Sequence, residues 1–105
     1  MPILKFYGLT EKEIIKYSKK TNELALLIQA KPNAISYVYI PSTILSPESD
    51  KEKVYIEINW ICRKIELREK MVNHIEDNFK HLNKIISIKF TDINRDFYVE
   101  GQVFG

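Results

Sequence analysis

Few residues of this chain have a type and spacing that would support chemistry. Arg63 precedes a stretch of helical periodicity, where a guanidinium could hold a substrate carboxylate through two parallel hydrogen bonds. The alternative is a solvated cation at a helix start, which the helix dipole mildly disfavours. His74 and His81 pair with no cysteine or carboxylate at metal-ligand spacing, so we expect both on the surface and no metal site.

Other candidates favour structural roles. Cys62 is the only cysteine, which excludes an internal disulfide and suits a reducing compartment. A cysteine of this kind is more often an unreactive thiol than a nucleophile. The three glycines are too few for a Gly-rich phosphate loop. We therefore expect no cofactor.

The first half of the chain has the pattern of one β-α-β unit. Residues 2–7 alternate as a short strand. Thr10 and Glu13 have the spacing of a capping box, and a single helix is predicted from there to about Ala30. Residues 35–40 form the second predicted strand.

The second half repeats the order after a polar loop at residues 46–53. Residues 54–61 alternate most clearly, with Trp60 expected in the core. A helix is predicted at 64–82 and a strand at 85–90. The tail, residues 97–104, predicts one short added strand.

These elements predict an α/β fold of two layers: a four-stranded mixed sheet, both helices on one face, and a short C-terminal strand. We interpret residues 1–105 as one domain with a pseudo-repeat at 2–45 and 53–97. The sheet face without helices mixes aromatic, polar and isoleucine side chains. That mixture indicates contact with another subunit rather than with bulk water.

Composition excludes several classes of partner. The chain has 16 basic and 14 acidic residues, a formal charge of +2, which is too even to favour nucleic acid or an anionic membrane. No apolar run approaches the roughly 20 residues of a membrane span, and the start lacks a signal-peptide pattern. We expect a cytoplasmic protein.

Fragments along nearly the whole chain resemble the tautomerase superfamily, also known for macrophage migration inhibitory factor. Some of them are closest to a small uncharacterised bacterial branch of that fold. The superfamily-like fragments are Met1-Pro2 directly before a strand, Lys31-Pro32 after the first helix, and IKFTDIN at 88–94; the branch-like ones are WICR at 60–63 and FYVEGQVF at 97–104.

The resemblance implies that the initiator methionine is removed and that Pro2 acts as a general base. An α-amino group titrates near ~8, and an apolar pocket beside cations lowers that pKa toward neutrality. Such an amine can move a proton next to a carbonyl. On its spacing alone, Pro2 only begins an edge strand, and a retained Met1 would leave its nitrogen a tertiary amide without proton chemistry.

The resemblance also implies a set of substrate-binding cations. Lys31 matches a lysine at the rim of the family's active site, and Arg63 matches an arginine of the bacterial branch. Ser87 and Lys89 stand where the family has a tyrosine and an asparagine. This departure puts a shared substrate in doubt, although Lys89 could still supply a cation.

Two functions therefore remain open. One is a cofactor-free keto–enol isomerase that acts on a small carboxylate through Pro2, with Arg63, Lys31 and Lys89 as binding residues. The other is a non-catalytic oligomeric binding protein of the same fold. For either function, the trimeric assembly that is usual in the family implies a homotrimer, with a dimer as the second choice.

Overall fold

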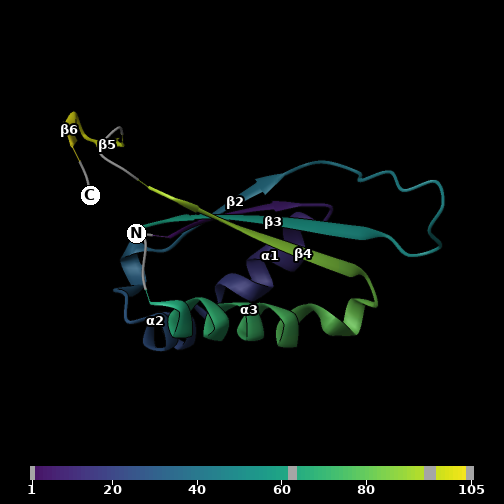
Figure 1. The fold of residues 1–105 in the computed structure, drawn as a ribbon, viewed down its shortest axis with the longest axis horizontal. Coiled ribbons are helices and arrows are strands. Elements are labelled where there is room, and N and C mark those ends of the chain that lie inside the picture. Colours follow the sequence, from purple (N-terminus) through teal and green to yellow (C-terminus); the bar gives the residue numbers. More distant parts are fainter. Residues whose placement is uncertain (1, 62–63, 94–96, 104–105) are drawn as a thin grey trace.

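The structure, a computed structural model, describes residues 2–61, 64–93 and 97–103. Its main sheet has four strands in the order β2-β1-β3-β4 (Figure 1). The pairs β1/β2 and β3/β4 are parallel, and β1/β3 is antiparallel, as two consecutive β-α-β units require. The strands are β1 (Ile3–Tyr7), β2 (Ser36–Ile40), β3 (Lys53–Trp60) and β4 (Ile85–Asp92). The predicted mixed sheet is confirmed, with β1 as an interior strand instead of an edge strand.

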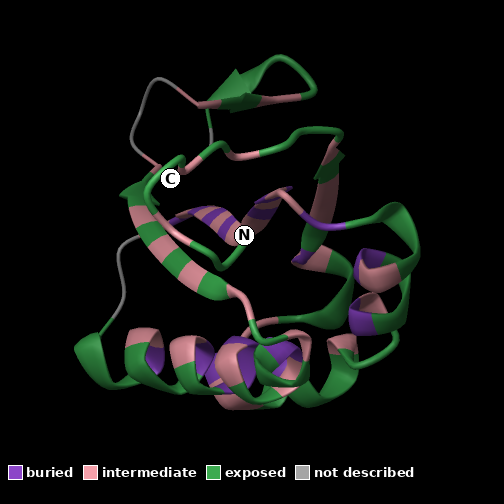
Figure 2. Ribbon diagram, turned by 90° about the vertical axis from the view of Figure 1, so that its right-hand side faces the viewer, coloured by how far each residue is buried: buried purple, intermediate pink, exposed green. Residues whose placement is uncertain are grey.

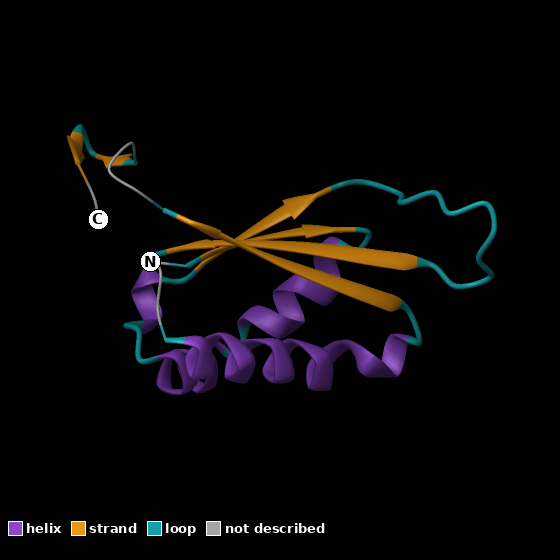
Figure 3. Ribbon diagram, in the orientation of Figure 1, coloured by secondary structure: helices purple, strands orange, loops and turns teal. Residues whose placement is uncertain are grey.

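All the helices lie on one face of this sheet (Figure 3). A short 3-10 turn, η1, follows α2, and another, η2, follows α3. The helical segments are α1 (Glu11–Ser18), α2 (Thr21–Ile28), η1 (Pro32–Ala34), α3 (Ile65–Phe79) and η2 (Lys80–Leu82). The predicted two-layer arrangement is therefore confirmed.

The first helical segment departs from the prediction, because it is two helices and not one. The Ser18 hydroxyl donates to the carbonyl of Ile15, and the Thr21 hydroxyl donates to the carbonyl of Ser18. Hydroxyl groups that bind nearby backbone in this way compete with the helical ladder. The chain turns at Lys19 and Lys20, and α2 starts in a new direction.

The core lies between the sheet and the helices (Figure 2). Every second residue of β1 and β3 is buried toward the helices, which confirms the predicted alternation and the core position of Trp60. The helices contribute a matching apolar stripe. The buried strand residues are Leu4, Phe6, Val54, Ile56, Ile58 and Trp60, and the largest helical ones are Tyr17, Leu24, Ile28, Met71, Ile75 and Phe79.

The opposite face of the sheet, here called the outer face, is covered by no helix among the described residues (Figure 3). In the middle of the sheet Lys5 pairs with Glu57 at 3.6 Å. Beside that ion pair, the rings of Tyr7 and Tyr55 lie 5.4 Å apart. The outer face is therefore a half-exposed layer of aromatic and paired charged groups.

Two further features mark the ends of the sheet. Gly8 ends β1 with a φ of +87°, and a Cβ there would lie 2.5 Å from the carbonyl oxygen of Lys53, so this turn requires glycine. The tail forms a small hairpin of its own, β5 (Tyr98–Val99) and β6 (Gln102–Val103), set apart from the main sheet (Figure 1). No helix among the described residues has the length and apolarity to cross a membrane.

Candidate functional site

Pro2 lies at the start of an interior strand. Its carbonyl accepts a hydrogen bond from the amide of Ser36 at 3.0 Å, which joins it to the start of β2. Ile3 pairs with Asn59 in the antiparallel register, so Pro2 comes opposite Trp60. The Pro2 side chain is less than 2% exposed. A proline at this position leaves no ladder donor unpaired, because it has no amide hydrogen.

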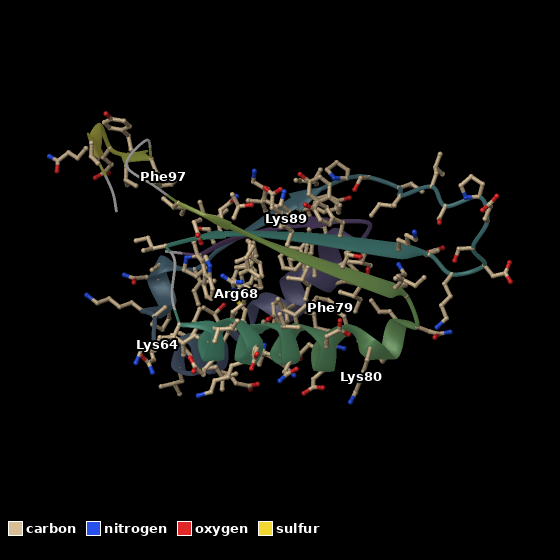
Figure 4. The ribbon with its side chains drawn as sticks, viewed as in Figure 1. Lys64, Arg68, Phe79, Lys80, Lys89 and Phe97 are labelled. Atoms are coloured by element: carbon tan, nitrogen blue, oxygen red, sulfur yellow. The ribbon has the colours of Figure 1, made fainter. Side chains whose placement is uncertain are left out.

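The two described lysines that were predicted as substrate-binding cations lie on different parts of the sheet. Lys31 is exposed and precedes η1, which leads directly to Ser36, so Lys31 and Pro2 share one end of the sheet. Lys89 is exposed on the outer face, in register with Glu57 of β3, on the opposite side of the sheet from α3 (Figure 4). It is not brought beside Pro2 within one chain. Arg63 lies outside the described residues.

Sequence reasoning did not single out one arginine that packs against the sheet. Arg68 reaches from α3 toward the sheet (Figure 4), with its guanidinium carbon 5.2 Å from the centre of the Phe90 ring. Trp60 packs on the same ring at 4.9 Å between ring centres. The position of Arg68 immediately after buried Leu67 was the available signal, but arginines beside an apolar stripe are usually solvated.

Two donors in this cluster have no acceptor. Trp60 is completely buried, and its Nε1 has no hydrogen-bond partner among the described residues. The Nε of Arg68 is likewise buried without a partner there. Buried donors are almost always satisfied in native proteins, so an unpaired pair in one place calls for an explanation.

A second polar constellation lies between the helices. The ring of His74 joins the Tyr17 hydroxyl at 2.9 Å through Nδ1 and the Glu23 carboxylate at 2.8 Å through Nε2. His74 is only 7% exposed, so the prediction that it lies on the surface is wrong. The sequence signal was its place three residues after Met71 on the buried stripe of α3.

The chemistry of Tyr17, His74 and Glu23 decides which of them donates and which accepts each hydrogen bond. A carboxylate can only accept, so His74 Nε2 carries a hydrogen and donates it to Glu23. Burial raises the pKa of Tyr17, helped by the neighbouring Tyr37 and Glu23. The phenol therefore keeps its proton and can donate to Nδ1, so both ring nitrogens of His74 have a partner.

Beside this constellation a cleft of about 230 Å³ opens between α1 and the end of α3. Tyr17 and Phe79 line its apolar part, and Lys16, Lys20 and His81 are among its polar lining residues. Pro2 does not line it. No group of three or more metal-ligating side chains is found within residues 2–61, 64–93 and 97–103.

The family model described as a domain of unknown function, DUF1904, matches residues 1–103. The chain belongs to the DUF1904 family. A solved DUF1904 structure from Sebaldella termitidis is 22% identical with a TM-score of 0.88, over 99% of this chain and 100% of that chain. No curated protein matches the sequence.

Other solved structures connect this DUF1904 chain to the predicted superfamily. A macrophage migration inhibitory factor from Oncomelania hupensis is 19% identical with a TM-score of 0.77, over 98% of this chain and 81% of that one. A fused 4-OT described as an asymmetric trimer is 14% identical with a TM-score of 0.76, over 96% and 94%. At these identities the likeness shows the fold alone, and it confirms the tautomerase-like fold.

Proposed function

We propose that this DUF1904 protein is a cofactor-free keto–enol isomerase of a small carboxylate, with Pro2 as its base after removal of Met1. The observation that carries the proposal is the place of Pro2 at the head of an interior strand of a tautomerase-like sheet. Pro2 is buried, and burial would lower the pKa of a free amine there because it penalises the charged form. Lys31, at the same end of the sheet, would add positive charge.

The burial of Pro2 favours a second candidate. A side chain less than 2% exposed offers a substrate no direct path within one chain. A non-catalytic oligomer that binds ligands or partners through its surface would need no such path. In that case the outer face, with its tyrosines and ion pair, would carry the function through assembly.

The two candidates differ in what the N-terminus does. Intact mass of the purified protein reports whether Met1 is gone, and turnover of a small 2-oxo acid is then followed by its enol absorbance. Pro2→Ala should lower the rate about 100-fold to 10,000-fold, the usual contribution of a general base. Pro47→Ala, in the exposed loop, is the matched control and should leave the rate unchanged.

A single negative result decides against the isomerase. Protein whose mass confirms a free Pro2, but which turns over none of a panel of small 2-oxo acids, leaves the binding protein as the better proposal. Equal rates for the wild type and Pro2→Ala would lead to the same conclusion.

A further inference from the structure

The cleft between α1 and the end of α3 is separate from the surroundings of Pro2. Its lining comes from α1, from the turn after α1, from the last turn of α3 and from η2, and neither Pro2 nor β1 contributes to it. The volume of about 230 Å³ is enough for a small molecule. The helical layer therefore carries a concave site of its own, which the proposed isomerase does not use.

Two aromatic rings form the apolar part of this cleft. Tyr17 and Phe79 both line it, and their ring centres lie 5.1 Å apart. Phe79 points from the end of α3 toward the sheet, whereas Lys80 points away from it (Figure 4). The Tyr17 hydroxyl is held by His74, which Glu23 holds in turn. Because neighbouring groups fix these rings before any ligand arrives, binding against them costs little ordering.

Among the described residues, the unpaired charges that border the cleft are positive. Lys16 and Lys20 are exposed, and neither ammonium group pairs with a carboxylate there. The two carboxylates of the lining are already engaged. Glu13 closes the capping box of α1, and Asp77 pairs at 3.8 Å with a lysine three residues further on. His81, exposed on the side of η2, adds a third nitrogen that can donate to a ligand.

These donors suit a phosphate better than a carboxylate. A carboxylate site favours the planar fork of an arginine, but the cations of this lining are lysines, which act as separate point charges. A phosphate monoester carries a charge of about −1.5 to −2 at neutral pH and has three strong acceptor oxygens. Those oxygens point in different directions, so they can accept from both sides of a cleft.

We propose that this cleft binds the phosphate monoester of a small aromatic alcohol. The apolar body lies against Tyr17 and Phe79, and the phosphate oxygens accept from Lys16, Lys20 and His81. The inference does not depend on the proposed function, because none of these residues takes part in the chemistry of Pro2.

The test is a titration of the full chain with phenyl phosphate, followed by calorimetry and by the NMR signals of the His81 ring. We expect saturable binding that shifts these signals. Inorganic phosphate lacks the ring and phenol lacks the charge, so each should bind more weakly than phenyl phosphate. Benzoate keeps the ring but has a planar carboxylate, and it should bind about tenfold more weakly, the factor expected when one charge-assisted hydrogen bond is lost.

A matched pair of double variants locates the site. Lys16→Gln with Lys20→Gln should weaken phenyl phosphate binding about tenfold, because two exposed charge-assisted hydrogen bonds are lost. Lys12→Gln with Lys19→Gln changes the net charge equally at two exposed lysines outside the lining, and should leave binding unchanged. All four side chains are exposed, so both proteins should fold, which far-ultraviolet circular dichroism checks.

Three results would overturn the proposal. Phenyl phosphate that does not bind saturably, or equal weakening in the two double variants, would reject the cleft as a site. Equal affinity for benzoate would reject the choice of phosphate.

Pro2→Ala separates this inference from the isomerase, because it should leave phenyl phosphate binding intact. Cleft binding in a protein without turnover would retain the phosphate site and reject the isomerase. Pro2-dependent turnover in a protein that does not bind phenyl phosphate would do the reverse.

Discussion

Tyr17 is held between groups that all favour its neutral form. It is 3% exposed, it donates to His74, and Glu23 lies beyond the histidine ring. Because burial raises its pKa, the folded state holds the phenolic proton more tightly than the unfolded chain does. Ionisation of this single residue therefore makes the free energy of unfolding depend on pH in the alkaline range.

The expected outcome follows from that direction. Below pH ~10 both states keep the proton, and the free energy of unfolding does not depend on this group. Above pH ~10 the unfolded chain loses the proton first, so the free energy of unfolding falls, by at most about 1.4 kcal/mol per pH unit for this residue. Tyr17→Phe should flatten the fall. Urea unfolding at pH 8, 9, 10 and 11 measures it.

The same variant should be less stable than the wild type at pH 8, by about 1–3 kcal/mol, because His74 Nδ1 loses its donor. Tyr98→Phe, on a tyrosine that is 62% exposed, is the control and should keep the wild-type pH profile. A Tyr17→Phe profile parallel to that of the wild type would show that Tyr17 does not cause the alkaline loss.

Among the elements, α1 has the best defined start. The Thr10 hydroxyl accepts from the Glu13 amide at 3.2 Å, and the Glu13 carboxylate accepts from the Thr10 amide at 2.8 Å. The predicted capping box is therefore confirmed. By contrast, α2 and α3 begin without a side-chain cap.

Thr10→Ala should lower the free energy of unfolding by about 1 kcal/mol, the usual value of a lost N-cap. Thr43→Ala, in the exposed loop after β2, is the matched control and should change it little. Thermal or urea unfolding measures both. Equal stability of Thr10→Ala and the wild type would mean that the cap contributes nothing to the fold.

Helices and strands whose pattern lies within their own residues could be predicted from the sequence. Contacts between residues of different elements could not. The alternation of β3 identified its buried face because the period of a strand is a local property. The break between α1 and α2 depends in part on the Thr21 hydroxyl meeting Tyr37, a residue of β2. His74 lies on the buried stripe of α3, but its partners Tyr17 and Glu23 come from α1 and α2, so the sequence around His74 does not show that its ring nitrogens are paired there.

At the scale of the whole molecule, the outer face is the sheet surface that no described helix covers (Figure 3). In register, Val38 of β2 lies beside Lys5 of β1 on this face. Aromatic side chains are enriched in protein interfaces, and Tyr7 and Tyr55 supply them on this face. We propose that this face is where the subunits of a homotrimer meet.

Val38→Lys should convert a trimer into monomers, because it places an unpaired charge in the proposed interface. Leu26→Lys, on a helical side chain that is 83% exposed, is the matched control and should leave the mass unchanged. Light scattering coupled to gel filtration measures both at micromolar concentrations. A wild-type monomer, or a Val38→Lys trimer, would contradict this interface.

The antiparallel contact at the middle of the sheet has a consequence for folding kinetics. Leu4 pairs with Ile58, so the two interior strands come from opposite halves of the chain. Each β-α-β half can close its own parallel pair, but neither half alone has an interior strand. The chain must bring together distant segments before the central ladder exists, and such non-local pairing slows folding. The rate-limiting step should therefore be the docking of two half-sheets, and substitutions at the β1/β3 contact should slow folding more than substitutions at the β3/β4 contact.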